Sequence, residues 1–356
     1  MLQEKYTPET LQDMKRVPAA QILHSLPFSS ISNIIFVGPE GAGKRTLFSA
    51  FLKHTFKNTP SFFSYTSAYE VSPSKTIDVE VLESKEVLEI KLEGMGTYDK
   101  KILQKIATDI SATKSIKNLM KSYEHAQNQN EDGNTHSGTK VSHPKILFIP
   151  DGHLLSTGAQ MALRRVLEKG ACNFQLVLLT NTLSHLIPAF KSRFLICRVP
   201  APSDQDISGV ISHISTEENI SIPEKTKQEI INRSNRNMRK AFSLLELAVH
   251  KQPLAVAPWD VIIIEIIRSV ESTPSVKALV ETREKIYKLL NNQVPSTYIF
   301  ETILEGLLQR EKRVEVAKSI TEIASKYTAR LCAGTKDMFH IEAFIANAMS
   351  LYADLE

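Results

Sequence analysis

Residues 34–46 read Ile-Ile-Phe-Val-Gly-Pro-Glu-Gly-Ala-Gly-Lys-Arg-Thr, and this stretch decides the fold. The apolar run 34–37 is typical of a buried parallel strand, and Thr46–His54 carries apolar residues at helical spacing. A glycine-rich turn joins the two. Since a strand, such a turn and a helix open many α/β domains that bind nucleotides, we expect a mostly parallel sheet with helices on both faces.

The turn satisfies the G-x-x-x-x-G-K pattern of a phosphate-binding loop (P-loop). Its glycines let successive backbone N–H groups point at phosphates, and its lysine adds a positive charge near the outer phosphates. The residues expected to line the phosphates are Gly38, Gly41, Gly43 and Lys44. The alternative is a chance match to a glycine-rich turn, against which the flanking strand and helix argue.

The position after the lysine departs from the pattern. A Ser or Thr is expected there, because its hydroxyl ligates Mg²⁺, but this chain has Arg45, with Thr46 one place late. A helix turns by roughly 100° per residue, so Thr46 cannot simply replace the missing hydroxyl. The phosphates can still be held, but the metal has lost a ligand.

The second half of such a site is a strand that ends in acidic residues. The candidate is the stretch 146–153, where Pro150 stands in place of the metal-holding Asp and Asp151 in place of a catalytic Glu. Asp151 is equally interpretable as an ordinary turn residue before a glycine. Two defects at one metal position predict little or no hydrolysis of ATP.

Strand patterns end near residue 199. Apolar runs at 145–149 and 175–180, with a helical pattern at 159–169 between them, continue the α/β domain. The later sequence is helical in pattern, with amphipathic stretches at Val276–Asn291, Ser296–Arg310 and His340–Tyr352. The expected domains are α/β over 1–199, a small helical domain over 200–252 and a helical C-terminal domain over 253–356.

The α/β domain contains a polar insertion over 114–142. Its part Tyr123–His143 is rich in Asn, Gln, Gly, Ser and His and nearly lacks apolar residues. Such a composition cannot build a packed core, so we expect a dispensable surface loop.

The composition is that of a globular protein, with 42% hydrophobic and 23% charged residues and a net charge of +4 over 356 residues. We find no apolar run near the roughly 18 residues that span a bilayer, and no basic region followed by an apolar core as in a secretory signal. The cysteines lie far apart without metal-ligand spacing, so we expect free thiols and no metal site: Cys172, Cys197 and Cys332.

Several motifs resemble those of one protein family. Residues 160–168, Gln-Met-Ala-Leu-Arg-Arg-Val-Leu-Glu, look like its Q-x-A-L-R-R-x-x-E helix. Ile-Pro-Ala-Phe-Lys-Ser-Arg at 187–193, followed by Val-Pro-Ala-Pro at 199–202, resembles its I-P-x-x-x-S-R-C … V-x-x-P segment. Glu-Lys-Tyr-Thr-Pro at 4–8 looks like its E-K-Y-R-P start. The family is that of the replication factor C small subunits, which are AAA+ ATPases.

Two further segments narrow the resemblance. Asn-Met-Arg-Lys-Ala at 237–241 resembles the second-sensor helix, and the tail over 327–344 is similar to that of the divergent small subunit with G-K-K-T in its P-loop and no D-E-A-D motif. The match covers nearly the whole chain apart from 114–142. It implies a RecA-like AAA+ domain, a helical lid domain and an all-α C-terminal collar domain.

The resemblance also implies residue roles around a bound ATP or ADP. Arg45 and Thr46 line the phosphates with the loop residues already named. Asn181 takes the first-sensor position and Arg239 the second. Thr7 replaces the Arg of the N-terminal motif, which puts that residue's contact around the adenine in doubt.

Arg193 matches the S-R-C arginine, which in the family reaches into a neighbouring subunit's ATP site. We expect this arginine to follow a strand on a Pro-bounded turn, from which its planar guanidinium can neutralise charge on a γ-phosphate. Without the resemblance, Arg193 would be taken for a surface arginine. Phe194 replaces the Cys of the motif, a conservative apolar change.

The family grips duplex DNA by its phosphates, which requires lysines and arginines rather than base-reading residues. The candidates are Lys100, Lys101, Lys105, Arg164 and Arg165. For the lysines, a solvated helix face is the alternative, and one of the two arginines is expected to be structural. Contact with the sliding clamp is expected from a surface helix and loop around Tyr69–Glu83.

The sequence therefore predicts a clamp-loader small subunit that binds ATP or ADP, with Mg²⁺ bound weakly or not at all. Within a nuclear heteropentamer it would help load the sliding clamp (PCNA) onto primer–template DNA in replication and repair. A stand-alone P-loop ATPase or kinase is one alternative, but it would need a Ser or Thr at 45 and an acid at 150. A purely structural subunit that binds no nucleotide is the other.

Overall fold

The computed structural model describes residues 2–14, 16–25, 33–56, 61–72, 75–92, 95–110, 145–168, 174–220, 222–250, 257–271, 275–334 and 336–353. The chain forms two compact units, Met1–Pro253 and Leu254–Glu356. The predicted insertion over 114–142, the loop Tyr123–His143 and Cys172 lie outside the described residues.

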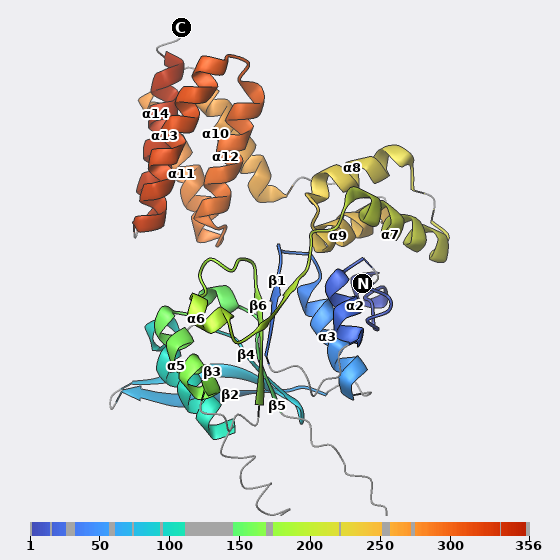
Figure 1. Cartoon of the computed structure of the whole chain (residues 1–356). Helices are drawn as coiled ribbons and strands as arrows, with labels where there is room; N and C mark the ends of the chain where they lie inside the picture. Colours follow the sequence, from blue (N-terminus) through green and yellow to red (C-terminus); the bar gives the residue numbers. More distant parts are fainter. Residues whose placement is uncertain are drawn as a thin grey trace, which may run out of the picture. The chain divides into compact units, whose positions relative to one another are not determined.

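A seven-stranded sheet organises the first unit, in the order β2-β3-β4-β5-β6-β1-β7 (Figure 1). The strands are β1 (Ile34–Val37), β2 (Phe63–Ser72), β3 (Lys75–Glu83), β4 (Val87–Ile90), β5 (Lys145–Ile149), β6 (Phe174–Thr180) and β7 (Leu195–Arg198). Strands β4, β5, β6, β1 and β7 run parallel, while β3 is antiparallel to both β2 and β4. The predicted parallel sheet is confirmed, with an antiparallel extension at one edge.

The central strands are apolar because both of their faces are covered. Every residue of β6 is buried, and Ile35 of β1 pairs with Leu178 of β6 in parallel register. Since the carboxyl ends of parallel strands meet at one edge of the sheet, the segments after β1, β5 and β6 converge there. This edge carries the predicted phosphate loop.

Helices cover both faces of the sheet, as predicted (Figure 1). On one face lie α2 (Pro18–Ser25) and α3 (Lys44–Phe56). On the other lie the helical residues 99–110, α5 (Thr157–Glu168) and α6 (Pro188–Lys191). The short α1 (Leu2–Lys5) precedes them at the N-terminus.

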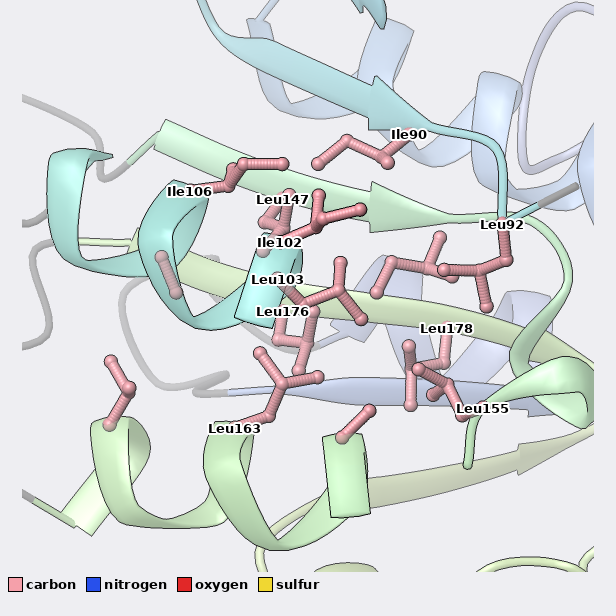
Figure 2. Close-up of a cluster of buried hydrophobic side chains, with 14 of the residues drawn as sticks. Ile90, Leu92, Ile102, Leu103, Ile106, Leu147, Leu155, Leu163, Leu176 and Leu178 are labelled. Carbon is pink, nitrogen blue, oxygen red and sulfur yellow. The ribbon is translucent and has the colours of Figure 1, made fainter. Parts of the chain in front are cut away.

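Aliphatic side chains fill the second of these faces. Figure 2 shows Ile102 and Ile106 of the helical residues 99–110, and Leu163 of α5, beside Leu147 and Leu176 of the sheet. All five are at most 3% exposed. Burial of such side chains fixes α5 and the segments that follow it against the sheet.

Three helices follow the sheet in the described part of the first unit. They are α7 (Asp204–Glu217), α8 (Glu224–Ser234) and α9 (Met238–Val249). Ser203 begins α7 with a capping box, in which its hydroxyl accepts from the Asp206 N–H at 3.1 Å. Asn237 begins α9, and its Oδ1 accepts from the Lys240 N–H at 3.2 Å.

The second unit is helical throughout its described residues. Its helices are α10 (Pro258–Glu271), α11 (Val276–Asn291), α12 (Ser296–Arg310), α13 (Val314–Ala333) and α14 (Asp337–Ala353). Phe300 and Phe344 lie in its core with ring centroids 4.6 Å apart. No described helix of the chain is long and apolar enough to cross a membrane.

The prediction of a helix and loop around Tyr69–Glu83 is wrong. Its described residues, 69–72 and 75–83, belong to β2 and β3, which pair antiparallel. In β3, the buried Val79 and Val81 alternate with the exposed Asp78 and Glu80. Such alternation of buried and exposed residues is typical of a half-buried strand, so the sequence pattern could have predicted β3.

Candidate nucleotide-binding site

The predicted phosphate loop joins β1 to α3. Gly41 and Gly43 have φ angles of 69° and 95°, a region that strains any residue with a side chain. This curl turns successive backbone N–H groups inward, and the positive end of the helix dipole at Lys44 adds to their effect. The backbone of the loop fits the phosphates of a nucleotide.

Lys44 and the predicted first-sensor residue Asn181 lie in direct contact. The Lys44 ammonium donates to Asn181 Oδ1 at 2.7 Å, and also to the carbonyl oxygens of Gly38 at 2.6 Å and Pro39 at 3.0 Å. The Asn181 amide donates in turn to Glu40 Oε1 at 3.2 Å. Burial lowers the pKa of Lys44, and the Glu40 carboxylate opposes that shift. The ammonium is thus anchored at the carboxyl edge of the sheet.

A cavity of about 280 Å³ opens beside the loop. The N-terminal segment, the loop and helices α3, α7 and α9 contribute its walls. Among its lining residues are Thr7, Gly41, Gly43, Thr46, Arg239 and Phe242. A concave site with apolar walls and a few charged groups suits a nucleotide. The structure therefore brings the predicted residues Thr46 and Arg239 to the same cavity as two of the loop glycines.

Arg16 lines this cavity too, although no motif in the sequence singled it out. Its Nη2 donates to the Ala42 carbonyl of the phosphate loop at 3.0 Å. Its Nη1 is buried and has no hydrogen-bond partner within the described part of the chain. Since buried donors are normally paired, an unpaired one beside a phosphate loop fits a bound anion. The residues of the cavity therefore fit the phosphates of a nucleotide.

Arg45 makes an ion pair that changes the metal side of the site. Its Nη2 lies 2.8 Å from Glu89 Oε1 and 2.9 Å from Oε2. Glu89 belongs to β4 and is only 4% exposed. Burial raises the pKa of the Glu89 carboxyl, and the Arg45 charge opposes this. Arg45, a positively charged residue, thus stands directly after Lys44, at the position where the P-loop pattern has a Ser or Thr whose hydroxyl binds the metal.

The candidate acidic half of the site follows strand β5. β5 ends at Ile149, and Pro150, which follows, has no side-chain oxygen to offer a metal. Asp151 comes next, and its negative charge contributes to raising the pKa of Glu89. Across the described residues, no group of three or more His, Cys, Asp or Glu side chains could hold a metal ion. These residues do not fit a tightly held Mg²⁺.

Arg193 follows helix α6 and precedes β7, so the expectation that it follows a strand is wrong. Its guanidinium forms an ion pair with Glu168 of α5 and donates to the Ala189 carbonyl. Phe194 packs against Phe190, with ring centroids 4.7 Å apart, and this contact fixes the turn. The guanidinium is held near the surface, with 31% of the side chain exposed.

The Glu168 carboxylate serves two arginines. Its Oε1 accepts from Arg164 Nε at 2.8 Å and also from Arg193. Hydrogen bonding to Arg164 lowers the pKa of Glu168, and the Arg193 charge adds to this effect. Arg164 is therefore the arginine of the Arg164–Arg165 pair that is engaged within the fold.

The five predicted DNA-contacting cations differ in how they are engaged within the chain. Lys100 and Arg165 line a common cavity of about 320 Å³ between the helical residues 99–110 and α5. Lys101 instead donates to the Val71 carbonyl at 3.0 Å. The Lys105 ammonium lies over the Tyr69 ring, 5.8 Å from its centroid. The last two lysines therefore connect the helical residues to strand β2.

Two protein-family models match parts of the chain. Residues 259–356 match the model described as "Replication factor C subunit 3, C-terminal domain". Residues 209–249 match "RCF1/5-like, AAA+ ATPase lid domain". The Thermotoga maritima RuvB Holliday junction branch migration motor aligns with a TM-score of 0.44 at 15% identity, over 75% of this chain and 79% of that one. That structural likeness is too weak to bear on function.

Curated relatives match over nearly their full length. Replication factor C subunit 3 of Arabidopsis thaliana is 30% identical over 362 residues, which cover 98% of this chain and 96% of that protein. Subunit 3 of Homo sapiens is 28% identical, with 98% and 95% covered, and subunit 5 of Saccharomyces cerevisiae is 28% identical, with 97% and 98% covered. With its phosphate loop, lid and C-terminal helices all in place, the chain belongs to the replication factor C subunit family.

Proposed function

We propose that this chain is a small subunit of a eukaryotic clamp loader that holds a nucleotide without hydrolysing it. The observation that carries the proposal is the Arg45–Glu89 ion pair, 2.8 Å long, next to an otherwise regular phosphate loop. Nucleotide binding requires the loop backbone and Lys44, which are present. Hydrolysis requires a metal and a positioned water, for which the site lacks the ligands.

The bound nucleotide is ATP or ADP. Gly38, Gly41, Gly43 and Lys44 hold the phosphates, with Arg45 and Thr46 in the first turn of α3. Asn181 and Arg239 approach from the end of β6 and from α9. Asp151 remains as the degenerate acid after β5, and Mg²⁺ binds weakly or not at all. The positive charge that offsets the phosphates therefore comes from the protein, because Lys44, Arg45 and Arg239 all lie near the loop.

Arg193 is the residue through which the subunit acts on a neighbour. It is a planar cation held near the surface by a helix-bounded turn, which suits contact with a γ-phosphate in another subunit. The subunit then contributes to hydrolysis that it does not perform. In this role the chain belongs to a heteropentamer with other replication factor C subunits.

The basic side chains of the helical residues 99–110 and of α5 contact the DNA. Lys100 and Arg165 form the centre of this surface, because they share a cavity and are exposed. Lys101, Lys105 and Arg164 lie at its margin, each already engaged within the chain. Such residues bind the phosphate backbone of primer–template DNA without reading its sequence.

The helices of the second unit form the collar that joins the subunits. They leave large apolar side chains exposed, among them Trp259, Val276, Val314 and Phe339 at 45%, 80%, 82% and 58%. In the proposed collar, helices of the neighbouring subunits cover these side chains. The assembled loader places the sliding clamp (PCNA) on DNA in the nucleus, during replication and repair.

Counting nucleotides in the purified five-subunit complex tests the proposal. Lys44→Ala should lower the bound nucleotide by one per complex and barely change the DNA-stimulated ATPase. Lys53→Ala, at the other end of α3, is the matched control and should change neither. A several-fold loss of ATPase would show that this site hydrolyses ATP. An unchanged nucleotide count would favour a purely structural subunit.

A further inference from the structure

Arg16 is delivered to the phosphate loop by a firmly anchored turn. Met14 and Val17 on either side of it are buried, and the Val17 N–H donates to the Met14 carbonyl at 3.0 Å. From this turn the guanidinium reaches the loop, where Nη2 donates to the Ala42 carbonyl at 3.0 Å. The Nη2 atom lies 3.7 Å from the point where a Cβ of Gly43 would be. The cation is therefore placed against the inner curve of the loop.

No described carboxylate lies within ion-pair distance of the Arg16 guanidinium, although burial lowers the pKa of Arg16 and the Asp206 charge opposes that shift. Its Nη1 is buried and has no partner among the described residues. Asp206 faces it across the cavity, but its Oδ2 already accepts from the N–H and the hydroxyl of Ser203, both at 2.8 Å, in the cap of α7. Asp13, the other acid of the cavity, accepts from the Thr10 hydroxyl at 2.7 Å. A buried donor of this kind costs stability until an acceptor arrives.

The location indicates which acceptor is missing. Lys44 is anchored to Asn181 at the end of β6, whereas Arg16 shares its cavity with Gly43, Thr46 and the lid residues of α7 and α9. The two cations thus approach the loop from different sides. The backbone N–H donors at the start of α3 suit the phosphates of a ligand. The cavity beyond them has apolar walls, which suit the nucleoside part of the same ligand.

We infer that Arg16 is a nucleotide-binding residue, whose free Nη1–H donates to the phosphate of ADP or ATP that is nearest to the nucleoside. The inference rests on the proposed nucleotide site and adds a residue to it. The bound phosphate supplies the acceptor that the buried guanidinium lacks. From the turn before α2, Arg16 then contacts the phosphate loop through Nη2 and the ligand through Nη1.

Binding and stability should respond to this residue in opposite directions. Arg16→Met keeps the length of the side chain but removes its charge and its donors. The nucleotide-free chain should then unfold at the same or a higher temperature, because removal of the unpaired buried Nη1 donor offsets the loss of the hydrogen bond from Nη2 to the Ala42 carbonyl. ADP should bind about ten- to a hundredfold more weakly, as expected for the loss of a charge-assisted hydrogen bond.

The experiment measures ADP affinity by calorimetry and the unfolding temperature without ligand, on the full-length chain. Wild type, Arg16→Met and Arg16→Gln are compared with Arg233→Met, a control in α8 whose arginine is ion-paired to Glu229 at 2.7 Å. Arg16→Gln retains donors without charge and should give an intermediate loss. Adenosine is titrated in parallel, and its weak binding should be equal in all four proteins.

Three outcomes would overturn the inference. Unchanged ADP affinity in Arg16→Met, with a lowered unfolding temperature, would make Arg16 a purely structural residue. An equal loss for adenosine and ADP would move its contact from the phosphate to the nucleoside. If wild type binds no ADP at all, the proposed function fails, and this inference with it.

Discussion

Glu89, buried in strand β4, holds the Arg45 guanidinium at 2.8 Å, directly after the lysine of the phosphate loop. The Glu89 carboxylate is buried, whereas 57% of the Arg45 side chain is exposed. Burial raises the pKa of Glu89, and the Arg45 charge opposes this, so Arg45 helps to keep the carboxylate charged. Breaking such a pair from the exposed side leaves a charge inside the protein without a partner.

We predict that Arg45→Ala destabilises the chain by about 1–3 kcal/mol, the penalty for an unsatisfied buried group. Glu89→Gln should cost less, because the amide is neutral. The double variant should be more stable than Arg45→Ala alone, since no unpaired charge remains. Urea unfolding of all four proteins measures this coupling. Strictly additive losses would mean that the two residues do not interact in solution.

Arg193→Ala is predicted to slow ATP hydrolysis at one neighbouring site. A fully engaged arginine finger is worth roughly 10³–10⁵ in rate. Arg193→Lys should not rescue the rate, because an ammonium keeps the charge but loses the forked geometry. The measurement is single-turnover hydrolysis in a complex whose other sites are disabled.

The control for this experiment is Arg233→Ala, which removes an exposed arginine of α8. ATP binding at the neighbouring site should remain nearly unchanged in both variants. If the remaining site hydrolyses ATP at the wild-type rate in the Arg193→Ala complex, the arginine is an ordinary surface residue held by Glu168.

Removal of residues 254–356 should keep the chain out of the pentamer while its first unit still folds. The first unit has cores of its own on both faces of the sheet, and the deleted helices carry the exposed apolar side chains of the proposed collar. Co-purification with the other subunits measures incorporation, and circular dichroism measures folding. Normal incorporation of the shortened chain would refute the collar assignment.

The cysteines should differ sharply in reactivity. Cys197 is buried in β7, and burial raises its pKa to about 11, whereas Cys332 is exposed on α13. A thiol is reactive as its thiolate, so at pH 8 we expect iodoacetamide to modify Cys332 in the isolated chain and leave Cys197 unmodified. Cys197 should react once the chain is unfolded. Mass spectrometry of the peptides measures both, and early modification of Cys197 would contradict its burial.

The sequence predicted best those elements whose pattern is local. β1 and β5 are short apolar runs, and α11 and α12 have an amphipathic period bounded by recognisable ends. Their bounds match the predicted ones, because burial of one face or of both leaves a periodic trace in the sequence. The strands β2 and β3 were missed although their alternation was present.

The candidate site was less predictable, because two of its residues matter through distant contacts. Glu89 stands in the run Val-Leu-Glu-Ile, where one charged residue among apolar ones was a usable signal of a buried pair. Arg16 carries no such signal, since its significance comes from the Ala42 carbonyl, 26 positions away. A motif identifies the loop, but only the fold shows which side chains surround it.

The first glycine of the loop is also required by a contact with the neighbouring strand. A Cβ on Gly38 would lie 2.1 Å from the Val199 carbonyl oxygen, at the end of the β1–β7 pairing, where no ligand is involved. Selection for a foldable sheet would therefore retain Gly38 even in a descendant that had stopped binding nucleotides. A Cβ on Gly41 would likewise lie 1.9 Å from Asn237 Oδ1, at the start of α9, whereas one on Gly43 would meet no atom closer than 3.7 Å. Packing of the fold therefore requires glycine at positions 38 and 41 whether or not a ligand is bound, and position 43 requires it only for the positive φ that shapes the cradle.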